Sequence, residues 1–462
     1  MKNTNKIIKG LVKDFTDLIS KDRINEIARK SKFVQRDSGK MTGETFFELA
    51  IFDNINLCTE SLEALSTFLF RKKNIEITSQ ALDERFNEKS VAFLKTVFNE
   101  MIMLKASNSF GINTAFTSHF NRIQITDSSI GELPTSCKSL YKGYGGNAAE
   151  SAVKVQFTFD IKSGNIGLID VGDVTNSDGG YLKTLDKSRE KNDLEIKDLG
   201  YYSIKNFDKI AKEGSFYLSR LKVGSLVYVI NPNPDKFATG NIKKSSEYIK
   251  LDLKIEAGNL KPGEIKEIKV FAGEDKVECR LILNRLPEEA VAKKLENQKK
   301  IARKKQIEIS DNSIDLSIVN MYITNVSADI LPKEIVYLIY SIRWQIEIIF
   351  KVLKSVFAFD KVKAVKQERI DCHLYSTLIR ILLSSKIVFS VRNSMYLYEE
   401  REISEYKAFN TVVTFFDEIK NALFHLTLDL ENLFERIVKA IYNNGMKSIN
   451  KNKKTVLAIL KL

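Results

Sequence analysis

Residues 340–354 have the sequence YSIRWQIEIIFKVLK, in which polar side chains recur at helical spacing. At about 100° per residue, Tyr340, Arg343, Glu347, Lys351 and Lys354 fall within roughly 80° of one another on a helix. Most other positions are Ile, Val or Leu, so the pattern predicts a buried helix with one polar stripe. Such a stripe suits a site for a metal ion and a phosphate. The alternative is a structural ion pair between Arg343 and Glu347, four residues apart.

The composition narrows the class of protein. The chain has 462 residues, of which 44% are hydrophobic and 28% charged, and this is typical of a folded chain with several domains. Its 72 Lys and Arg against 59 acidic residues leave a net charge of +13. A polyanion such as nucleic acid is therefore the expected partner, because neutralised phosphates release counterions. A generically basic protein is the alternative.

Several classes of protein are not expected. Residues 1–10, MKNTNKIIKG, are basic and lack the apolar segment of a secretory signal, and no run of 18 apolar residues suggests a membrane span. The four cysteines and three histidines lack metal-binding spacing. We therefore expect no cysteine- or histidine-based zinc motif, no disulfide framework and no cysteine or histidine catalysis, and a reducing cytosol suits the chain.

Residues 1 to about 110 show helical periodicity. After the basic turn at residues 71–74, Thr78 is a candidate N-cap for a short helix reaching Phe86, and another helix is predicted from 90 to 103. A helix, a turn and a capped helix would suit a helix-turn-helix DNA reader. An ordinary helical bundle has the same pattern.

Alternating residues predict strands after position 120. Residues 122–127 form a predicted strand that ends in Asp127, and residues 154–161 and 166–171 predict a hairpin. Asp198 ends a short predicted strand at 194–198, and Ser203 is a candidate cap for a helix to about Glu213. A turn or cap role is the alternative for each aspartate.

The second half of the chain is β-rich and then helical. Short strands are predicted from 223 to 285 and again at 315–326, and Pro332 is expected to open the helix with the polar stripe. Residues 290–306 form a strongly basic predicted helix that includes Lys299, Lys300, Arg303 and Lys304. This charge run favours contact with a phosphate backbone over a merely solvated face.

Two strand-end aspartates and a helical glutamate suggest a metal site. Asp127, Asp198 and Glu347 could meet at a sheet edge and hold two divalent cations, since hard cations such as Mg²⁺ prefer carboxylate oxygens. Two ions about 3.5–4 Å apart can activate an attacking oxygen and stabilise the leaving oxygen in phosphoryl transfer.

The same residues resemble a known family. The spacing Tyr-x2-Arg-x3-Glu-x6-Lys of Tyr340, Arg343, Glu347 and Lys354 is similar to the YREK signature of DDE transposases of the insertion-sequence-four family. Asp127, in ITDSS, and Asp198, in DLGY, resemble the first and second catalytic aspartates. Leu199 stands where the family often has a basic residue. Asn320 stands where some relatives have a tryptophan used in hairpin formation, so a hairpin intermediate is left open.

The resemblance implies an α/β fold in which a ribonuclease H-like catalytic core is interrupted by a β-rich insertion and flanked by helical N- and C-terminal domains. The implied parts are a helical DNA-binding domain at 1–115, a core in two pieces at 116–222 and 327–395, an insertion ending in the basic helix at 223–326, and a helical region at 396–462 that could dimerise.

The resemblance also implies a function. Asp127, Asp198 and Glu347 would be catalytic ligands for two Mg²⁺ or Mn²⁺ ions. The implied DNA contacts are Tyr340, Arg343, Lys354, Lys351, Trp344, Arg220, Lys299, Lys300, Arg303 and Lys304. The expected protein is a bacterial cytoplasmic, nucleoid-associated transposase that acts as a homodimer on DNA. It would bind terminal inverted repeats, cleave the DNA and join the 3′-OH ends to target DNA. The alternatives are a ribonuclease H-like nuclease without strand transfer and a transposase-derived DNA-binding protein.

Overall fold

The fold is taken from a computed structural model that describes residues 4–36, 41–53, 55–103, 111–145, 148–448 and 454–462. By their contacts these residues form two compact units. Unit 1 comprises Met1–Ile112, Asp127–Asn176 and Trp344–Leu457, and unit 2 comprises Asn113–Thr126, Ser177–Arg343 and Ala458–Leu462. Two of the boundaries between the units fall inside strand β1 (Ile123–Leu133), after Thr126, and inside the segment predicted as the polar-stripe helix, after Arg343. The division into five segments expected from the sequence stays a prediction.

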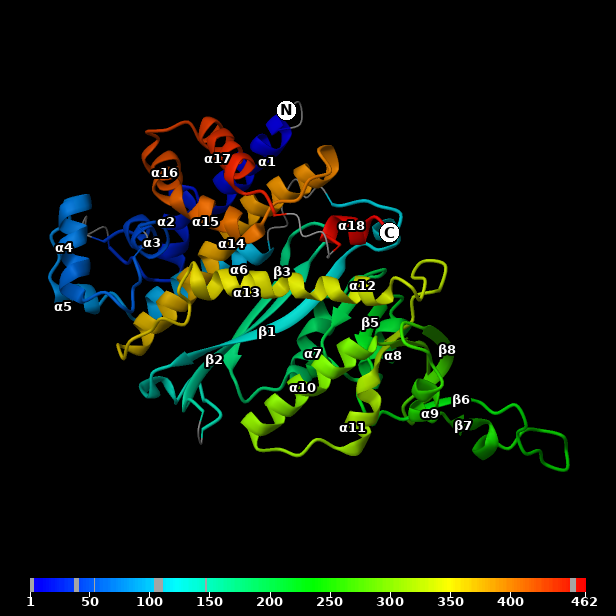
Figure 1. The fold of residues 1–462 in the computed structure, drawn as a ribbon. Coiled ribbons are helices and arrows are strands. Elements are labelled where there is room, and N and C mark those ends of the chain that lie inside the picture. The colour runs from blue at the N-terminus through cyan, green and yellow to red at the C-terminus, as the bar shows by residue number, and fades with distance from the viewer. Residues whose placement is uncertain (1–3, 37–40, 54, 104–110, 146–147, 449–453) are drawn as a thin grey trace. The chain divides into compact units, whose positions relative to one another are not determined.

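Unit 1 is largely helical, in agreement with the helical N- and C-terminal regions expected from the sequence (Figure 1). Its N-terminal helices are α1 (Thr4–Ile19), α2 (Lys21–Lys30), α3 (Gly43–Ile51), α4 (Leu62–Lys73), α5 (Ser79–Asp83) and α6 (Glu88–Met103). Its later helices are α13 (Gln345–Ser355), α14 (Gln367–Tyr398), α15 (Glu405–Thr414), α16 (Phe416–Lys420), the π-helix η7 (Asn421–His425) and α17 (Leu430–Asn444). A last helix, α18 (Val456–Leu460), begins in unit 1 and ends in unit 2.

Helix α14 forms the centre of this helical unit. It packs against α1, α3, α6 and α15. Among the described residues, α14 is the one helix long and apolar enough to cross a membrane, and 83% of its most apolar window is buried inside the protein. The four cysteines are free and buried.

The predicted cap of the short N-terminal helix is confirmed, but the helix is shorter than expected. The Thr78 side chain accepts a hydrogen bond from the backbone N–H of Ala81, as an N-cap does. Helix α5 ends at Asp83, because the chain turns there and the N–H of Phe86 bonds to the carbonyl of Asp83. Phe86 is fully buried, so it reaches the core from a turn rather than from the helix.

The predicted hairpin of unit 1 is confirmed. Strands β2 (Ser151–Asp160) and β3 (Ile166–Asp173) pair antiparallel, with Val155 opposite Val171. Gly164 in the connecting turn has φ +81°, and a Cβ there would lie 2.3 Å from Phe389 of α14. Both constraints require glycine at this position.

Unit 2 is built on a mixed sheet. The first residues of β1 (Ile123–Leu133), β4 (Leu194–Lys197) and β5 (Phe216–Arg220) run parallel. The sheet continues through antiparallel strands in the order β10 (Val319–Thr324), β9 (Val277–Arg285), β8 (Ile265–Ala272), β6 (Val227–Ile230) and β7 (Tyr248–Lys250). The helices of unit 2 are α7 (Asp178–Ser188), α8 (Ile204–Lys212), α9 (Leu253–Gly258), α10 (Glu288–Lys305), α11 (Asp311–Asp315) and α12 (Val336–Ser341).

Helix α8 and the apolar strand faces close the core of unit 2. Ser203 caps α8 through the N–H of Asn206, and Gly214, with φ +73°, follows its end, as the sequence predicts. Phe207 and Ile210 of this helix join a buried cluster with Tyr217, Leu281 and other residues of β5, β8, β9 and β10. The Phe207 and Tyr217 rings stack at 4.5 Å between centroids.

Two predicted strands differ in the structure. Strand β1 does not end at Asp127 but continues to Leu133, because Gly131 and Leu133 extend the apolar pattern and Gly131 leaves room for the Phe359 ring. Strand β10 begins only at Val319, since residues 311–315 form α11 and residues 316–318 form a 3₁₀ turn.

The stripe helix is not continuous. Helix α12 begins at Val336, four residues after Pro332, and a 3₁₀ turn, η6 (Ile342–Trp344), separates it from α13. The Ser341 hydroxyl donates to the carbonyl of Leu338 at 2.6 Å just before the break, a local bond of a kind that perturbs helices. Because a 3₁₀ turn has three residues per turn, the uniform 100° spacing assumed for residues 340–354 is wrong.

Candidate functional site

Two residues of the polar stripe meet the second predicted catalytic aspartate. Asp198 lies directly after β4, before the short turn η3 (Leu199–Tyr201), and its side chain is 41% exposed. The Tyr340 hydroxyl donates to Asp198 Oδ1 at 3.4 Å, and Arg343 Nε lies 3.9 Å from the same oxygen. All three residues belong to unit 2. Tyr340 and Arg343 therefore converge on one carboxylate, which lies 142 positions before Tyr340 in the sequence.

Burial keeps the Tyr340 hydroxyl protonated. Burial, followed by the negative charge of Asp198, raises the pKa of Tyr340 to about 12. The phenol is therefore a hydrogen-bond donor at neutral pH. The Tyr322 ring of β10 lies 5.2 Å from the Tyr340 ring between centroids and supports it from the sheet.

A cationic pair flanks these residues on the sheet. Arg220, at the end of β5, is the register partner of Tyr322. Lys294 of α10 donates to the Val319 carbonyl at 3.1 Å and to Asn320 Oδ1 at 3.2 Å. Burial, together with the nearby positive charge of Arg220, lowers the pKa of Lys294 to about 8. Sequence reasoning placed Lys294 only within a charge run and did not distinguish it as the lysine that faces the sheet.

The other basic residues of α10 have a different environment. Lys299, Lys300, Arg303 and Lys304 are exposed, and Lys300 pairs with Glu296 at 2.7 Å on the same helix. An exposed ion pair of this kind contributes little to stability. These four side chains are accessible to a polyanion, and their role in DNA binding stays a prediction.

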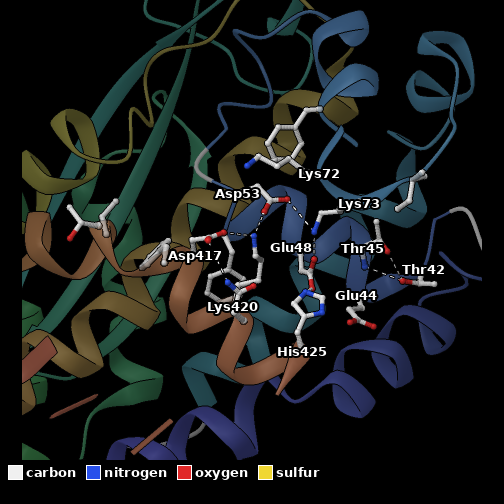
Figure 2. A pocket seen from close by; sticks show the side chains of 17 residues that line it. Thr42, Glu44, Thr45, Glu48, Asp53, Lys72, Lys73, Asp417, Lys420 and His425 are labelled. Atoms are coloured by element: carbon white, nitrogen blue, oxygen red, sulfur yellow. Dashed lines mark hydrogen bonds and ion pairs between the residues drawn. The ribbon is translucent and has the colours of Figure 1, made fainter. Parts of the chain in front are cut away.

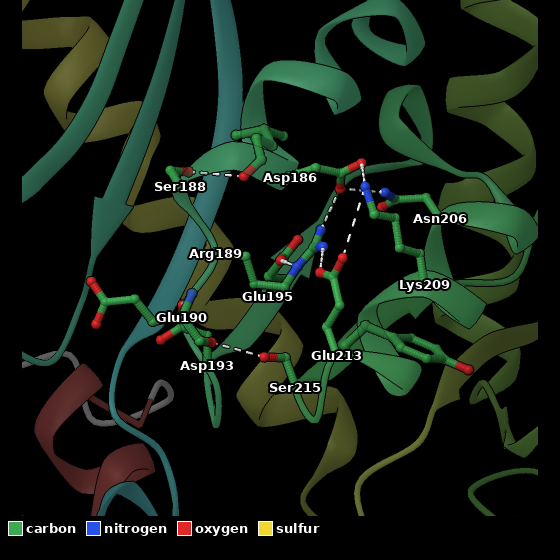
Figure 3. Close-up of polar contacts among 12 residues, drawn as sticks. Asp186, Ser188, Arg189, Glu190, Asp193, Glu195, Asn206, Lys209, Glu213 and Ser215 are labelled. Atoms are coloured by element: carbon green, nitrogen blue, oxygen red, sulfur yellow. Dashed lines mark hydrogen bonds and ion pairs between the residues drawn. The ribbon is translucent and has the colours of Figure 1, made fainter.

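A buried ionic network holds β4, the strand that directly precedes Asp198. Arg189 contacts Asp186, Glu195 and Glu213 (Figure 3). Burial by itself would lower the pKa of the Arg189 guanidinium. The three carboxylates, with Glu195 contributing most, outweigh this effect and raise the pKa.

The network continues through Lys197, the residue immediately before Asp198. Lys197 pairs with Glu195 and donates to Asn206 Oδ1 at 3.0 Å, and burial lowers its pKa. Both Glu195 and Lys197 belong to β4, so the network fixes the backbone that carries Asp198. The sequence contained no local signal for it, since its members are spread from 186 to 213.

Asp127 and Asp198 each follow the last residue of the β1–β4 pairing. Thr126 and Lys197 are register partners in the parallel pair β1–β4, and each is followed directly by one of the predicted catalytic aspartates. The Asp127 carboxylate accepts a hydrogen bond from the N–H of Ser128 at 2.8 Å. Asp127 is half-buried.

Within unit 1, helix α13 is tied to the strand of Asp127. Lys354 Nζ donates to the carbonyl of Ile130, three residues after Asp127, at 2.7 Å. Glu347 lies on the same helix, two turns before Lys354, and is half-buried. The Lys354 ammonium thus binds protein backbone in this structure.

The two other predicted DNA contacts within residues 340–354 lie at the surface. The Lys351 ammonium lies 4.4 Å from the centre of the Tyr406 ring, a cation–π contact. Trp344 is 59% exposed, which is unusual for the sole tryptophan of a chain. The roles predicted for Lys351 and Trp344 in DNA binding are not decided by these contacts.

Comparison with known proteins gives consistent matches. Residues 118–383 match the family model described as "Transposase DDE domain". The chain is 36% identical to the transposase for insertion sequence element IS1151 of Clostridium perfringens, over 99% of this chain and 97% of that relative. It is 35% identical to the transposase for IS231F of Bacillus thuringiensis subsp. israelensis, over 98% and 95%. It is 34% identical to the transposase for IS231B of Bacillus thuringiensis subsp. berliner, over 95% and 92%.

Proposed function

The chain belongs to the DDE transposases of insertion sequences, and we propose that it carries out cut-and-paste transposition. Membership implies a ribonuclease H-like fold, DNA phosphoryl transfer, use of divalent metal ions and binding of transposon DNA. The proposal adds that the protein recognises the terminal inverted repeats of its element, cleaves there and joins the freed 3′-OH to target DNA. We further propose a homodimer in the DNA complex and a cytoplasmic, nucleoid-associated location in a bacterial cell.

Three carboxylates are the proposed metal ligands. Asp127, Asp198 and Glu347 form an all-oxygen donor set, which suits Mg²⁺ or Mn²⁺. Asp198 is partly exposed, so its oxygens are accessible to an ion. When bound, two such ions would polarise the scissile phosphate and favour an oxygen nucleophile.

The chain's own groups would position the carboxylate and the phosphate. The Tyr340 hydroxyl orients Asp198 by donating to Oδ1. The Arg343 guanidinium has a planar fork of donors suited to phosphate oxygens, and its Nε lies 3.9 Å from Asp198. The convergence of Tyr340 and Arg343 on Asp198 is the observation that carries the proposal. A purely structural ion pair between neighbouring helical residues would not require contact with a carboxylate 142 positions earlier in the chain.

Positive side chains near these groups would hold the DNA backbone. The proposed contacts, besides Tyr340 and Arg343, are Lys354, Lys351, Trp344, Arg220, Lys299, Lys300, Arg303 and Lys304. The net charge of +13 supports them.

Purified protein incubated with Mg²⁺ and a duplex containing the element's terminal repeat tests the proposal. We expect cleaved ends and products joined to a second DNA, and we expect Asp198→Asn to abolish both. Asp208→Asn is the matched control, because Asp208 of α8 pairs with the exposed Lys212 at the surface. Full activity of Asp198→Asn would overturn the proposal.

The same assay separates the two alternatives. Products that are cut but never joined would indicate a nuclease without strand transfer. Binding of terminal-repeat DNA without metal-dependent cleavage would indicate a transposase-derived DNA-binding protein.

A further inference from the structure

A second group of metal-binding side chains lies within unit 1, apart from the proposed catalytic carboxylates. Glu44 and Glu48 are one turn apart on α3, and His425 ends the π-helix η7. One ligand atom from each residue lies within 4.8 Å of the others. These three residues line a pocket that also contains Asp53, Lys73 and Lys420, and Figure 2 shows Glu48 and His425 pointing toward each other.

Two buried carboxylate oxygens of this pocket, one from Glu48 and one from Asp53, lack a hydrogen bond. Glu48 is 2% exposed, and its Oε1 has no hydrogen-bond partner among the described residues. His425 Nε2 lies 3.0 Å from this oxygen, a contact that is ionic only when the imidazole is protonated. Asp53 Oδ2 is likewise buried without a hydrogen bond, 3.4 Å from Lys73 Nζ. Because a desolvated carboxylate oxygen without a donor is costly, a cation here would compensate for the burial.

Lysines hold the other oxygen of each glutamate. Lys73 pairs with Glu48 Oε2, and Lys21 pairs with Glu44 Oε2 at 3.0 Å. Glu48 therefore keeps its Oε1 for a further ligand, and each glutamate is oriented by an outer partner, as is common around metal ligands. The His425 side chain is 42% exposed, so an ion can enter from solvent and water can complete its coordination.

We propose that Glu44, Glu48 and His425 bind one Zn²⁺ ion. Two carboxylates and an imidazole match zinc, whereas Mg²⁺ and Ca²⁺ prefer oxygen ligands alone. The ion would join α3 to the C-terminal helices through residues far apart in sequence and so stabilise unit 1. Lys21, Lys73 and Lys420 reduce the negative charge that a cation meets, so we expect weaker binding than in a zinc finger.

The test measures bound zinc in full-length protein. Asp127→Asn, Asp198→Asn and Glu347→Gln are combined in a background variant, so that the proposed catalytic site does not contribute ions. Equilibrium dialysis against Zn²⁺ followed by elemental analysis should give one ion per chain. Zn²⁺ should also raise the unfolding temperature of this background variant.

Adding His425→Asn should remove the bound zinc and the rise in unfolding temperature. His425 is partly exposed, so this variant is expected to fold, and circular dichroism checks that it does. His119→Asn, which changes another exposed histidine, is the matched control and should bind zinc as the background does. Zinc binding that survives His425→Asn, or a background variant that binds no zinc, would overturn the proposal.

Discussion

Replacing Tyr340 with phenylalanine tests whether this hydroxyl orients Asp198, one of the proposed catalytic carboxylates. The variant removes the hydroxyl that donates to Asp198 Oδ1 at 3.4 Å and keeps the ring that packs on Tyr322. A hydrogen bond to a charged group contributes about 1.5–3 kcal/mol. This bond is long and Asp198 is 41% exposed, so solvent screening reduces the expected loss to about 1 kcal/mol.

A loss of about 1 kcal/mol corresponds to roughly five-fold slower cleavage, because about 1.4 kcal/mol changes a rate tenfold. The assay is single-turnover cleavage of labelled terminal-repeat DNA at saturating protein and Mg²⁺, which separates the chemical step from product release. The raised pKa of Tyr340, about 12, means that the effect should not vary between pH 7 and pH 9.

Tyr337→Phe is the matched control. Tyr337 lies on the same helix, α12, but its side chain is 47% exposed, so its cleavage rate should equal that of the wild type. A Tyr340→Phe variant that cleaves at the wild-type rate would refute the reasoning. An equal decrease for both variants would also refute it, since the decrease would then come from the helix and not from the hydrogen bond.

Three further predictions concern stability and pH. Arg189→Met should lower the free energy of unfolding by about 3–5 kcal/mol in urea titrations, because it removes a cation that neutralises the buried Glu195 carboxylate. Lys212→Ala, at an exposed position, is the control and should change the free energy of unfolding by less than about 0.5 kcal/mol. Lys294 loses its proton as pH rises through about 8, so terminal-repeat DNA should bind more weakly above that pH in filter-binding titrations. Lys294→Gln should remove this pH dependence of DNA binding. An unchanged pH dependence in the variant would contradict a contact between Lys294 and DNA. Burial lowers the pKa of His373 from 6.5 to about 4. The contribution of the neutral imidazole to stability is therefore fully present above pH 6.5 and is lost as pH falls toward 4. Urea titrations should show that the free energy of unfolding decreases by roughly 3 kcal/mol over this range, and His373→Asn should lack this decrease.

Elements with strong local signals were predicted well. Thr78 and Ser203 were identified as helix caps because capping depends on a side chain and an N–H three residues later. The β2–β3 hairpin followed from alternation on both sides of a turn with Gly164. Asp198 was predicted as the last residue of a short strand, and it lies one residue after the end of β4. The prediction was close because turn residues commonly stand where strands end.

Predictions that assumed regular geometry over a long stretch were less accurate. The 3₁₀ turn at 342–344 divides the stripe helix, and β1 passes through Asp127 without ending. Local preference does not determine such details, because packing partners far along the chain decide whether a turn tightens or a strand continues.

The spacing of Tyr340, Arg343, Glu347 and Lys354 was enough to indicate the family, because the whole signature lies within one short segment of sequence. The three-dimensional fold was needed to bring Tyr340 and Arg343 to Asp198, to turn Lys294 toward the sheet, and to place His425 beside Glu48. These contacts join residues separated by tens to hundreds of positions. Their existence depends on the burial of distant surfaces against one another, and no local sequence pattern records that burial.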